Sequence, residues 1–365
     1  MKIFTICLVA ILCLSACSPS NEPISSYGAA DEADVSKLAL TWPTEIGRHD
    51  FEIRVPAGHS DPETFIPITV INGQRSGPTL LMVAGVHGYE FAPILAAKEL
   101  ADELKASKMS GRVVIVRTAH VSAFEARSPY VNPYDRLNLN RSFPGRANGT
   151  QTERIAYALS THVIPQADIV LDVHSGDGAE WLEAFIGVYG GPLATNYSQA
   201  LSVAEHFGFS NIVRYKMNTQ EQVDTRRSLN RQAVAEGLPT LLVEIGENGK
   251  RDAGHVQAIV SGVKNALNVV GILPEHNATR SPNIRYLDGT NSVPVEHSGI
   301  WTPKLARAQI VQTGDILGFI HDYDGTLLQT VEAPVEGYTI YGLAGPPVRK
   351  GESVATIGRV VDTFK

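Results

Sequence analysis

Four side chains that can bind a metal ion or transfer a proton stand at the ends of short apolar segments. His87 and Glu90 follow one such segment, His174 follows a second and Glu244 a third. Two histidines and a glutamate are a ligand set used by catalytic zinc sites, because three protein ligands leave the fourth position for water. Zinc lowers the pKa of that water to about 7, and a nearby carboxylate can then take and return its proton. The pattern predicts one zinc ion per chain on His87, Glu90 and His174, with Glu244 as the general base and acid.

Each of these residues also has a purely structural interpretation. Glu90 could be favoured by the dipole at the start of a helix, His174 could hydrogen-bond at a strand end, and Glu244 could pair with an arginine. The placement of all four residues at strand ends favours the metal site. Asp172 alternates with His174 along one strand and so shares its face. From there it either orients the histidine or makes an ordinary structural hydrogen bond.

The segments that carry these residues alternate with longer helix-like segments, which indicates an α/β fold. Short, largely apolar runs are typical of strands buried on both faces. The expected strands are residues 79–84, 112–117, 169–173 and 239–243. The expected helices are residues 91–107, 152–163, 196–207, 228–235 and 256–269. We therefore expect a mostly parallel mixed sheet with helices on both faces over residues 45–281, with the site beyond the carboxyl ends of its strands.

Residues 282–365 differ in character, with short strands separated by Gly, Pro and Asp. Residues 311–320 and 348–357 share the pattern of a turn followed by an alternating strand. Such a pair resembles the half-repeats of a barrel-sandwich hybrid, the fold of biotinyl and lipoyl carriers. A carrier needs a modifiable lysine, and residues 333–345 contain none. The region is therefore expected to be a small all-β, barrel-sandwich-like domain that caps the catalytic one.

The first residues are typical of an export signal. Lys2 precedes an apolar run that is too short to span a bilayer, so residues 1–16 are expected to be a signal peptide. Leu-Ser-Ala-Cys, ending at Cys17, resembles the bacterial lipobox, which implies cleavage before Cys17 and a lipid attached to it. A plain signal peptide cut nearby is the alternative. Residues 17–44 are then a tether, and the protein is lipid-anchored in the cell envelope, on the outer membrane facing the periplasm.

Composition and missing motifs exclude several classes of function. The chain has 365 residues, a formal net charge of -7 and no long block of Lys or Arg, so a nucleic-acid partner is not expected. Phosphate-binding glycine loops are absent, which argues against a nucleotide, and so is the G-x-S-x-G elbow of serine hydrolases. All three cysteines lie at or before Cys17, which rules out thiolate zinc ligands and a cysteine nucleophile in the mature chain.

Four ordered motifs resemble the succinylglutamate desuccinylase/aspartoacylase family, which belongs with the carboxypeptidase A-like zinc hydrolases. The resemblance extends over about residues 79–357. It rests on GVHGYE at 85–90, NLNRSFPG at 138–145, LDVHSG at 171–176 and VEIG at 243–246. It implies the zinc carboxypeptidase-like fold, the three zinc ligands and the role of Glu244 given above.

The resemblance also implies residues that bind the substrate. In the family, the Asn-Arg pair of the second motif helps to hold the substrate carboxylate, which carries over to Asn140 and Arg141. A guanidinium matches a carboxylate in a bidentate way, so the chemistry agrees. The family also places an arginine upstream that polarises the scissile carbonyl and stabilises the oxyanion. Arg127 and Arg136 both qualify; we assign the oxyanion to Arg127 and place Arg136 with the substrate-binding residues. The alternative is that either one is a solvated loop charge.

The expected function is zinc-dependent hydrolysis of the amide bond of an N-acyl amino acid or a related small amide. One alternative is a zinc carboxypeptidase that acts on envelope peptides or cell-wall stem peptides, which the expected location favours. A second alternative is a binding lipoprotein without catalysis, against which the four intact chemical positions argue. The partners are thus a small N-acyl amino acid or short peptide and, through Cys17, a membrane.

Overall fold

The computed structural model describes residues 34–38, 40–225, 227–304 and 307–364. Cys17 and the predicted signal peptide lie outside the described residues. Within these ranges, no helix combines the length and the apolar character needed to cross a membrane.

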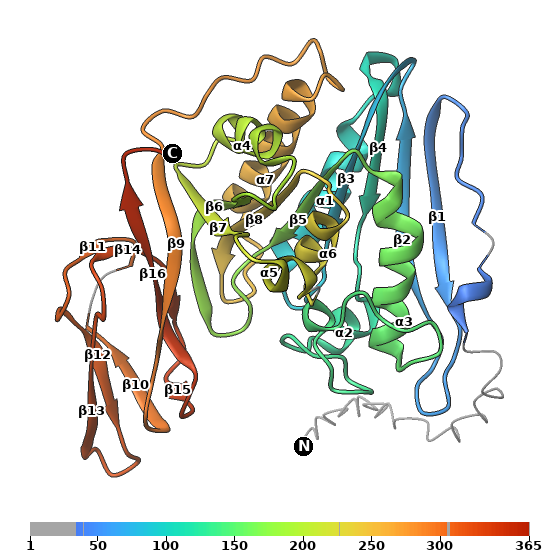
Figure 1. Cartoon of the computed structure of the whole chain (residues 1–365). Helices are drawn as coiled ribbons and strands as arrows, with labels where there is room; N and C mark the ends of the chain where they lie inside the picture. Colours follow the sequence, from blue (N-terminus) through green and yellow to red (C-terminus); the bar gives the residue numbers. More distant parts are fainter. Residues whose placement is uncertain (1–33, 39, 226, 305–306, 365) are drawn as a thin grey trace, which may run out of the picture.

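A mixed sheet of twelve strands runs through the described part of the chain (Figure 1). Its central strands are parallel and largely buried, as the apolar runs predict. In sheet order they are β4 (Ser110–Val116), β3 (Arg75–Ala84), β5 (Ile169–His174) and β8 (Thr240–Glu247). The carboxyl ends of these strands therefore meet at one edge of the sheet.

Antiparallel pairs flank this centre, so the expectation of a mostly parallel sheet is correct only for its middle. On one side, β1 (Gly47–Val55) and β2 (Thr64–Asn72) form a hairpin, because a short connection can join only antiparallel neighbours. On the other side, β6 (Glu180–Gly190) runs antiparallel to β8, and β7 (Asn211–Lys216) then runs parallel to β6.

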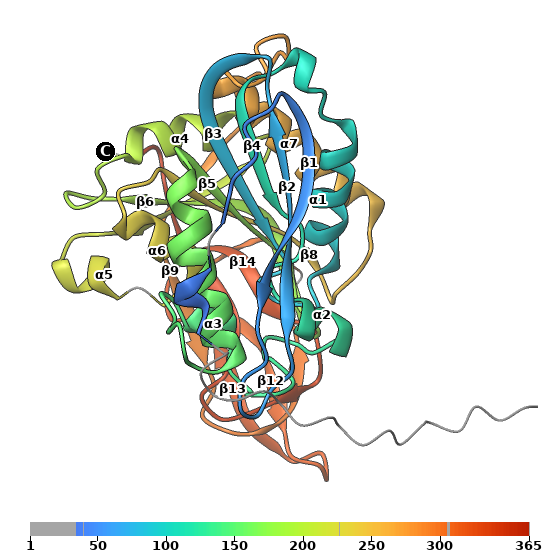
Figure 2. The same cartoon turned by 90° about the vertical axis from the view of Figure 1, so that its right-hand side faces the viewer.

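Helices cover both faces of the sheet, as predicted. Alternate residues of β3 point to opposite faces, with Leu80 and Met82 in one core and Leu81 and Val83 in the other. Figure 2 shows α1 and α7 on one side of the sheet and α3 and α6 on the other. The first core holds α1 (Phe91–Glu103), α4 (Tyr197–His206) and α7 (Ala253–Val269). The second holds α3 (Gln151–Ala158) and α6 (Leu229–Ala235).

Several shorter helices complete this part of the fold. The α-helical ones are α2 (Val121–Ala126) and α5 (Gln220–Asp224). A π-helical turn, η5 (Leu159–Val163), continues α3. The 3-10 turns are η2 (Val35–Lys37), η3 (Ala106–Lys108), η4 (Leu139–Arg141) and η6 (Ile164–Gln166).

In the described part of residues 282–364 the regular elements are all strands, and some of them extend the main sheet. From β7 the order continues through β9 (Arg285–Pro294), β16 (Ser353–Val361), β14 (Gly337–Leu343) and β11 (Ile310–Val311). A second sheet contains β13 (Leu327–Glu332), β12 (Ile316–His321), β10 (Gly299–Pro303) and β15 (Pro347–Val348). An apolar cluster that includes Trp301, Ile320 and Ile357 lies between the two sheets. The last residues of β14 also pair with the first residues of β6, so the C-terminal strands contact the central part of the main sheet.

Candidate metal centre

The loop between β3 and α1 carries His87 and Glu90, and two glycines determine its shape. Gly85 has a φ of +70°, in the left-handed region that favours glycine. A Cβ on Gly88 would lie 2.2 Å from backbone atoms of Ala123 and Phe124, so only glycine allows this loop to pack against α2. The loop thus places both side chains at the carboxyl end of β3.

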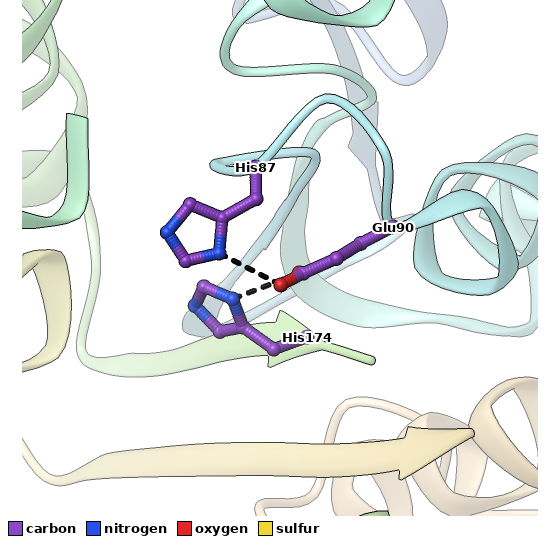
Figure 3. A group of neighbouring side chains, drawn as sticks. All are labelled: His87, Glu90 and His174. Atoms are coloured by element: carbon purple, nitrogen blue, oxygen red, sulfur yellow. Dashed lines mark hydrogen bonds and ion pairs between the residues drawn. The ribbon is translucent and has the colours of Figure 1, made fainter. Parts of the chain in front are cut away.

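His87, Glu90 and His174 converge on one point (Figure 3). The Nδ1 atom of His87 lies 2.7 Å from Oε1 of Glu90, and Nδ1 of His174 lies 2.9 Å from Oε2 of the same carboxylate. One potential ligand atom from each residue lies within 4.8 Å of the others, and all three residues are buried. Two segments separated by more than eighty residues therefore supply a single compact cluster.

Charge pairing outweighs burial in this cluster. Burial alone would raise the pKa of the Glu90 carboxyl, but the adjacent His174 and His87 lower it to about 2. Burial alone would lower the pKa of His174, but Asp172 and Glu90 raise it well above its usual value. The carboxylates thus create a negative environment that favours a positive charge at this point.

Two oxygen acceptors fix the outer nitrogens of the two imidazoles. Nε2 of His174 lies 2.9 Å from Oδ1 of Asp172, whose Oδ2 accepts a hydrogen bond of 2.9 Å from Asn230 Nδ2. Nε2 of His87 lies 3.2 Å from Oδ1 of Asn138, which also accepts from the Asn140 backbone N–H. With the proton on each Nε2, each Nδ1 becomes the nitrogen that can bind a metal. Asp172 lies where the sequence predicts it, with no exposed surface.

The donor set of this cluster fits a zinc ion. It consists of two imidazole nitrogens and one carboxylate, which zinc prefers and which catalytic zinc sites use. A proton on Nδ1 of His174 would occupy the side of the ring that faces Glu90. A divalent cation could replace it and leave the Nε2 bond to Asp172 intact.

Glu244 lies beside the cluster, on the strand next to His174. The two residues are directly opposite each other in the parallel pairing of β5 and β8. Among the residues that the structure describes, Oε2 of Glu244 is buried and has no hydrogen-bond partner. Burial raises the pKa of Glu244 well above its usual value, and the negative charge of Glu90 adds to this effect. A carboxyl group with a raised pKa and an unused oxygen is suited to exchange a proton.

A cavity of about 540 Å³ opens over the cluster, and part of its wall is basic. Asn140 and Arg141 line it, together with Arg227 and Arg231. The segment that carries Asn140 and Arg141 is joined to the start of α6, because Leu229 N–H donates to Oδ1 of Asn140 at 3.1 Å. Arg227 and Arg231 could not be identified from the sequence, because they precede or begin a short helix and belong to no motif that marks them.

Arg127 and Arg136, to which the sequence assigns the oxyanion and substrate binding, do not line this cavity. Both side chains are exposed, and neither lines the cavity. Arg127 ends α2 with a φ of 50°, and Arg136 has a φ of 62° in the following loop. Both residues have a left-handed backbone conformation and belong to a surface loop. The path of this loop could not be predicted from the sequence. Within the described part of the chain, the cavity's guanidinium groups are those of Arg141, Arg227 and Arg231.

Comparison with known proteins identifies relatives along most of the chain. Residues 76–270 match the family model for the succinylglutamate desuccinylase/aspartoacylase catalytic domain. The N-alpha-acetyl-L-2,4-diaminobutyric acid deacetylase of Halomonas elongata is 30% identical over 306 residues, which are 82% of this chain and 87% of that protein.

Solved structures show the same architecture. The product-bound ectoine utilization protein EutE (DoeB) of Ruegeria pomeroyi has a TM-score of 0.78 and 27% identity, over 87% of this chain and 98% of that one. A succinylglutamate desuccinylase/aspartoacylase of Rhodobacter sphaeroides has a TM-score of 0.79 and 24% identity, over 89% and 99% of the two chains. The likenesses extend well beyond residue 270, so the C-terminal strands belong to the shared fold.

Proposed function

Because the chain belongs to the succinylglutamate desuccinylase/aspartoacylase family, we propose that it is a zinc-dependent hydrolase that removes the acyl group from an N-acyl amino acid. The observation that carries this proposal is the buried His87, Glu90 and His174 cluster with Glu244 beside it. The Halomonas elongata relative is a deacetylase of an N-acetylated diamino acid, which supports an amide bond as the target.

In this proposal His87, Glu90 and His174 hold one zinc ion. When bound, zinc supplies Lewis-acid chemistry, since it polarises a carbonyl oxygen and makes water more acidic. Asp172 and Asn138 keep the two imidazoles oriented through their Nε2 atoms.

The protein's own groups then bind the substrate and move the proton. Arg141, Arg227 and Arg231 face the cavity and attract the carboxylate of the amino acid, and the Asn140 amide stands beside them. Glu244 accepts a proton from the attacking water and passes it to the leaving amine. Its buried, unpartnered oxygen makes it ready for this transfer.

The test replaces Glu244 by Gln in the zinc-loaded protein, with N-α-acetyl-L-2,4-diaminobutyrate among the substrates. We expect turnover to fall by roughly 100-fold or more, since general acid–base catalysis contributes about 10²–10⁴. Zinc content should not change. The matched control is Glu247→Gln on the same strand, where the carboxylate pairs with Lys250 instead. Turnover of Glu244→Gln within a few fold of the wild type would exclude the proposed role.

For the location, we propose that Cys17 carries a lipid that anchors the enzyme in the cell envelope. Support comes from the lipobox-like sequence alone. Mass spectrometry of the membrane fraction from the native host, compared for wild type and Cys17→Ala, tests it. Loss of membrane attachment in the variant is expected, and equal attachment of both would overturn the assignment.

A further inference from the structure

A second cavity adjoins the metal cavity and is twice as large. It measures about 1080 Å³ and lies between the loops around Pro129 and Gly178 and the C-terminal strands β9, β15 and β16. It shares Tyr130, Glu180 and Tyr341 with the metal cavity. These three residues, which we call the neck, therefore stand between the two spaces.

The neck holds an acidic group close to the metal ligands. The Tyr341 hydroxyl donates to Oε1 of Glu180 at 2.8 Å, and the Asp177 backbone N–H donates to Oε2 at 3.2 Å. The ring of Tyr130 meets the ring of His87 edge-on, with centroids 5.7 Å apart. A chain that leaves the metal centre through the neck thus passes a carboxylate that can accept further hydrogen bonds.

The wall of the second cavity combines apolar side chains with several hydroxyl groups. Ser292 on β9 and Thr356 on β16 are paired across the sheet and both line it. No hydrogen bond among the described residues engages either hydroxyl. Tyr323, 86% exposed, and Arg349 also line this cavity. Such a wall suits a ligand that carries its own hydrogen-bonding groups.

The two cavities together are larger than a small N-acyl amino acid requires. A pocket of about 300–1,000 Å³ already buries most of a drug-sized ligand, and the metal cavity alone falls in that range. The neck lines both cavities, so a substrate bound at the metal centre that is too long for the first cavity would extend past the neck into the second. The second cavity is therefore placed to receive an extended acyl group.

We propose that the natural substrate carries a polar acyl chain of aminoacyl or peptidyl type, which passes the neck and binds in the second cavity. This inference rests on the proposed function and specifies its substrate class. Backbone N–H groups or an amine of such a chain would donate to Glu180, and its carbonyl groups would accept from Ser292 and Thr356. The C-terminal strands then contribute to substrate binding in addition to capping the catalytic sheet.

The test compares two substrates with the same amino acid, N-α-acetyl-L-2,4-diaminobutyrate and the corresponding glycylglycyl compound. For the zinc-loaded wild type we expect a higher kcat/KM with the longer substrate. Ser292→Trp should lower the ratio of the two kcat/KM values at least tenfold, and Thr356→Trp, at the facing position, should act the same way. Asn291→Trp, one residue away and outside both cavities, should leave the ratio unchanged. Calorimetry measures the affinity of the zinc-loaded Glu244→Gln variant for the longer compound. Adding Ser292→Trp to this variant should lower that affinity at least tenfold as well.

The outcomes separate this inference from the function on which it rests. Hydrolysis of the acetyl compound alone, or a ratio that neither tryptophan changes, would overturn the extended substrate and leave the deacylase intact. If the zinc-loaded wild type hydrolyses neither compound nor any other N-acyl amino acid, the proposed function fails as well.

Discussion

The substitution Asp172→Asn tests the metal centre most selectively, because it replaces a single oxygen atom of the carboxylate by nitrogen. The Asp172 carboxylate is fully buried, lies 2.9 Å from Nε2 of His174 and accepts from Asn230 on the other side. Asp172→Asn keeps the shape but replaces a charged acceptor by a neutral one. Hydrogen bonds to charged groups contribute roughly 1.5–3 kcal/mol and neutral ones roughly 0.5–1.5. The difference of about 1–1.5 kcal/mol corresponds to a zinc affinity roughly 5- to 13-fold weaker.

Loss of orientation adds to this effect, since partners that orient a metal-binding histidine typically change metal affinity by about 10–100-fold. We therefore expect Asp172→Asn to weaken zinc binding about tenfold or more. The assay is competition with a chromophoric chelator, with circular dichroism as the check on folding. Asp168→Asn is the matched control, because Asp168 is exposed and accepts from Thr79 N–H just before β5, at the end of that strand opposite to His174. A folded Asp172→Asn protein whose zinc affinity is within twofold of the wild type would refute the reasoning.

Three further predictions concern the cavity, the loop and the protons. Arg231→Met should raise KM for an N-acyl amino acid about tenfold or more in steady-state kinetics, since a charge-assisted hydrogen bond contributes roughly 1.5–3 kcal/mol. Arg136→Met should leave KM unchanged, because Arg136 does not line the cavity. Equal effects of the two substitutions would contradict the assignment of Arg231 to the cavity wall. Gly88→Ala should cost roughly 1–3 kcal/mol in a denaturant titration and weaken zinc binding, because its Cβ would overlap the backbone at Phe124; an unchanged midpoint and affinity would show that the loop needs no glycine. At a pH below the raised pKa of His174, zinc must displace a proton from this residue, so zinc affinity should fall as the pH falls. Calorimetric titrations in buffers of different ionisation enthalpy measure the number of protons released. A result of no proton release would contradict this prediction.

The central strands and helices could be predicted because burial on both faces leaves short, unbroken apolar runs. Residues 79–84 and 169–173 lie within β3 and β5 as predicted, and residues 256–269 lie within α7. The strands β1 and β6 were missed for a physical reason. β1 lies at the sheet edge and its residues alternate in exposure, and the first half of β6 is only partly buried and contributes Glu180 to the cavity.

The residues of the candidate site could be predicted where the central parallel strands determine their position. His87 and Glu90 follow β3, His174 ends β5, and Glu244 lies within β8 directly opposite His174, so the topology of one parallel group brings them together. The arginines depend on how loops return to the cavity, and periodicity carries no information about that. Family resemblance identified Arg141 by its motif, whereas Arg231 could be found only once the fold placed α6 beside that motif.

The most direct test of the central claim is a calorimetric zinc titration of the metal-stripped protein. It should bind one zinc ion per chain, and Glu90→Gln should bind it at least about 100-fold more weakly, because Glu90 is the carboxylate that meets both imidazoles. Tight binding of one ion by both proteins, or no stoichiometric binding by the wild type, would contradict the proposed metal centre.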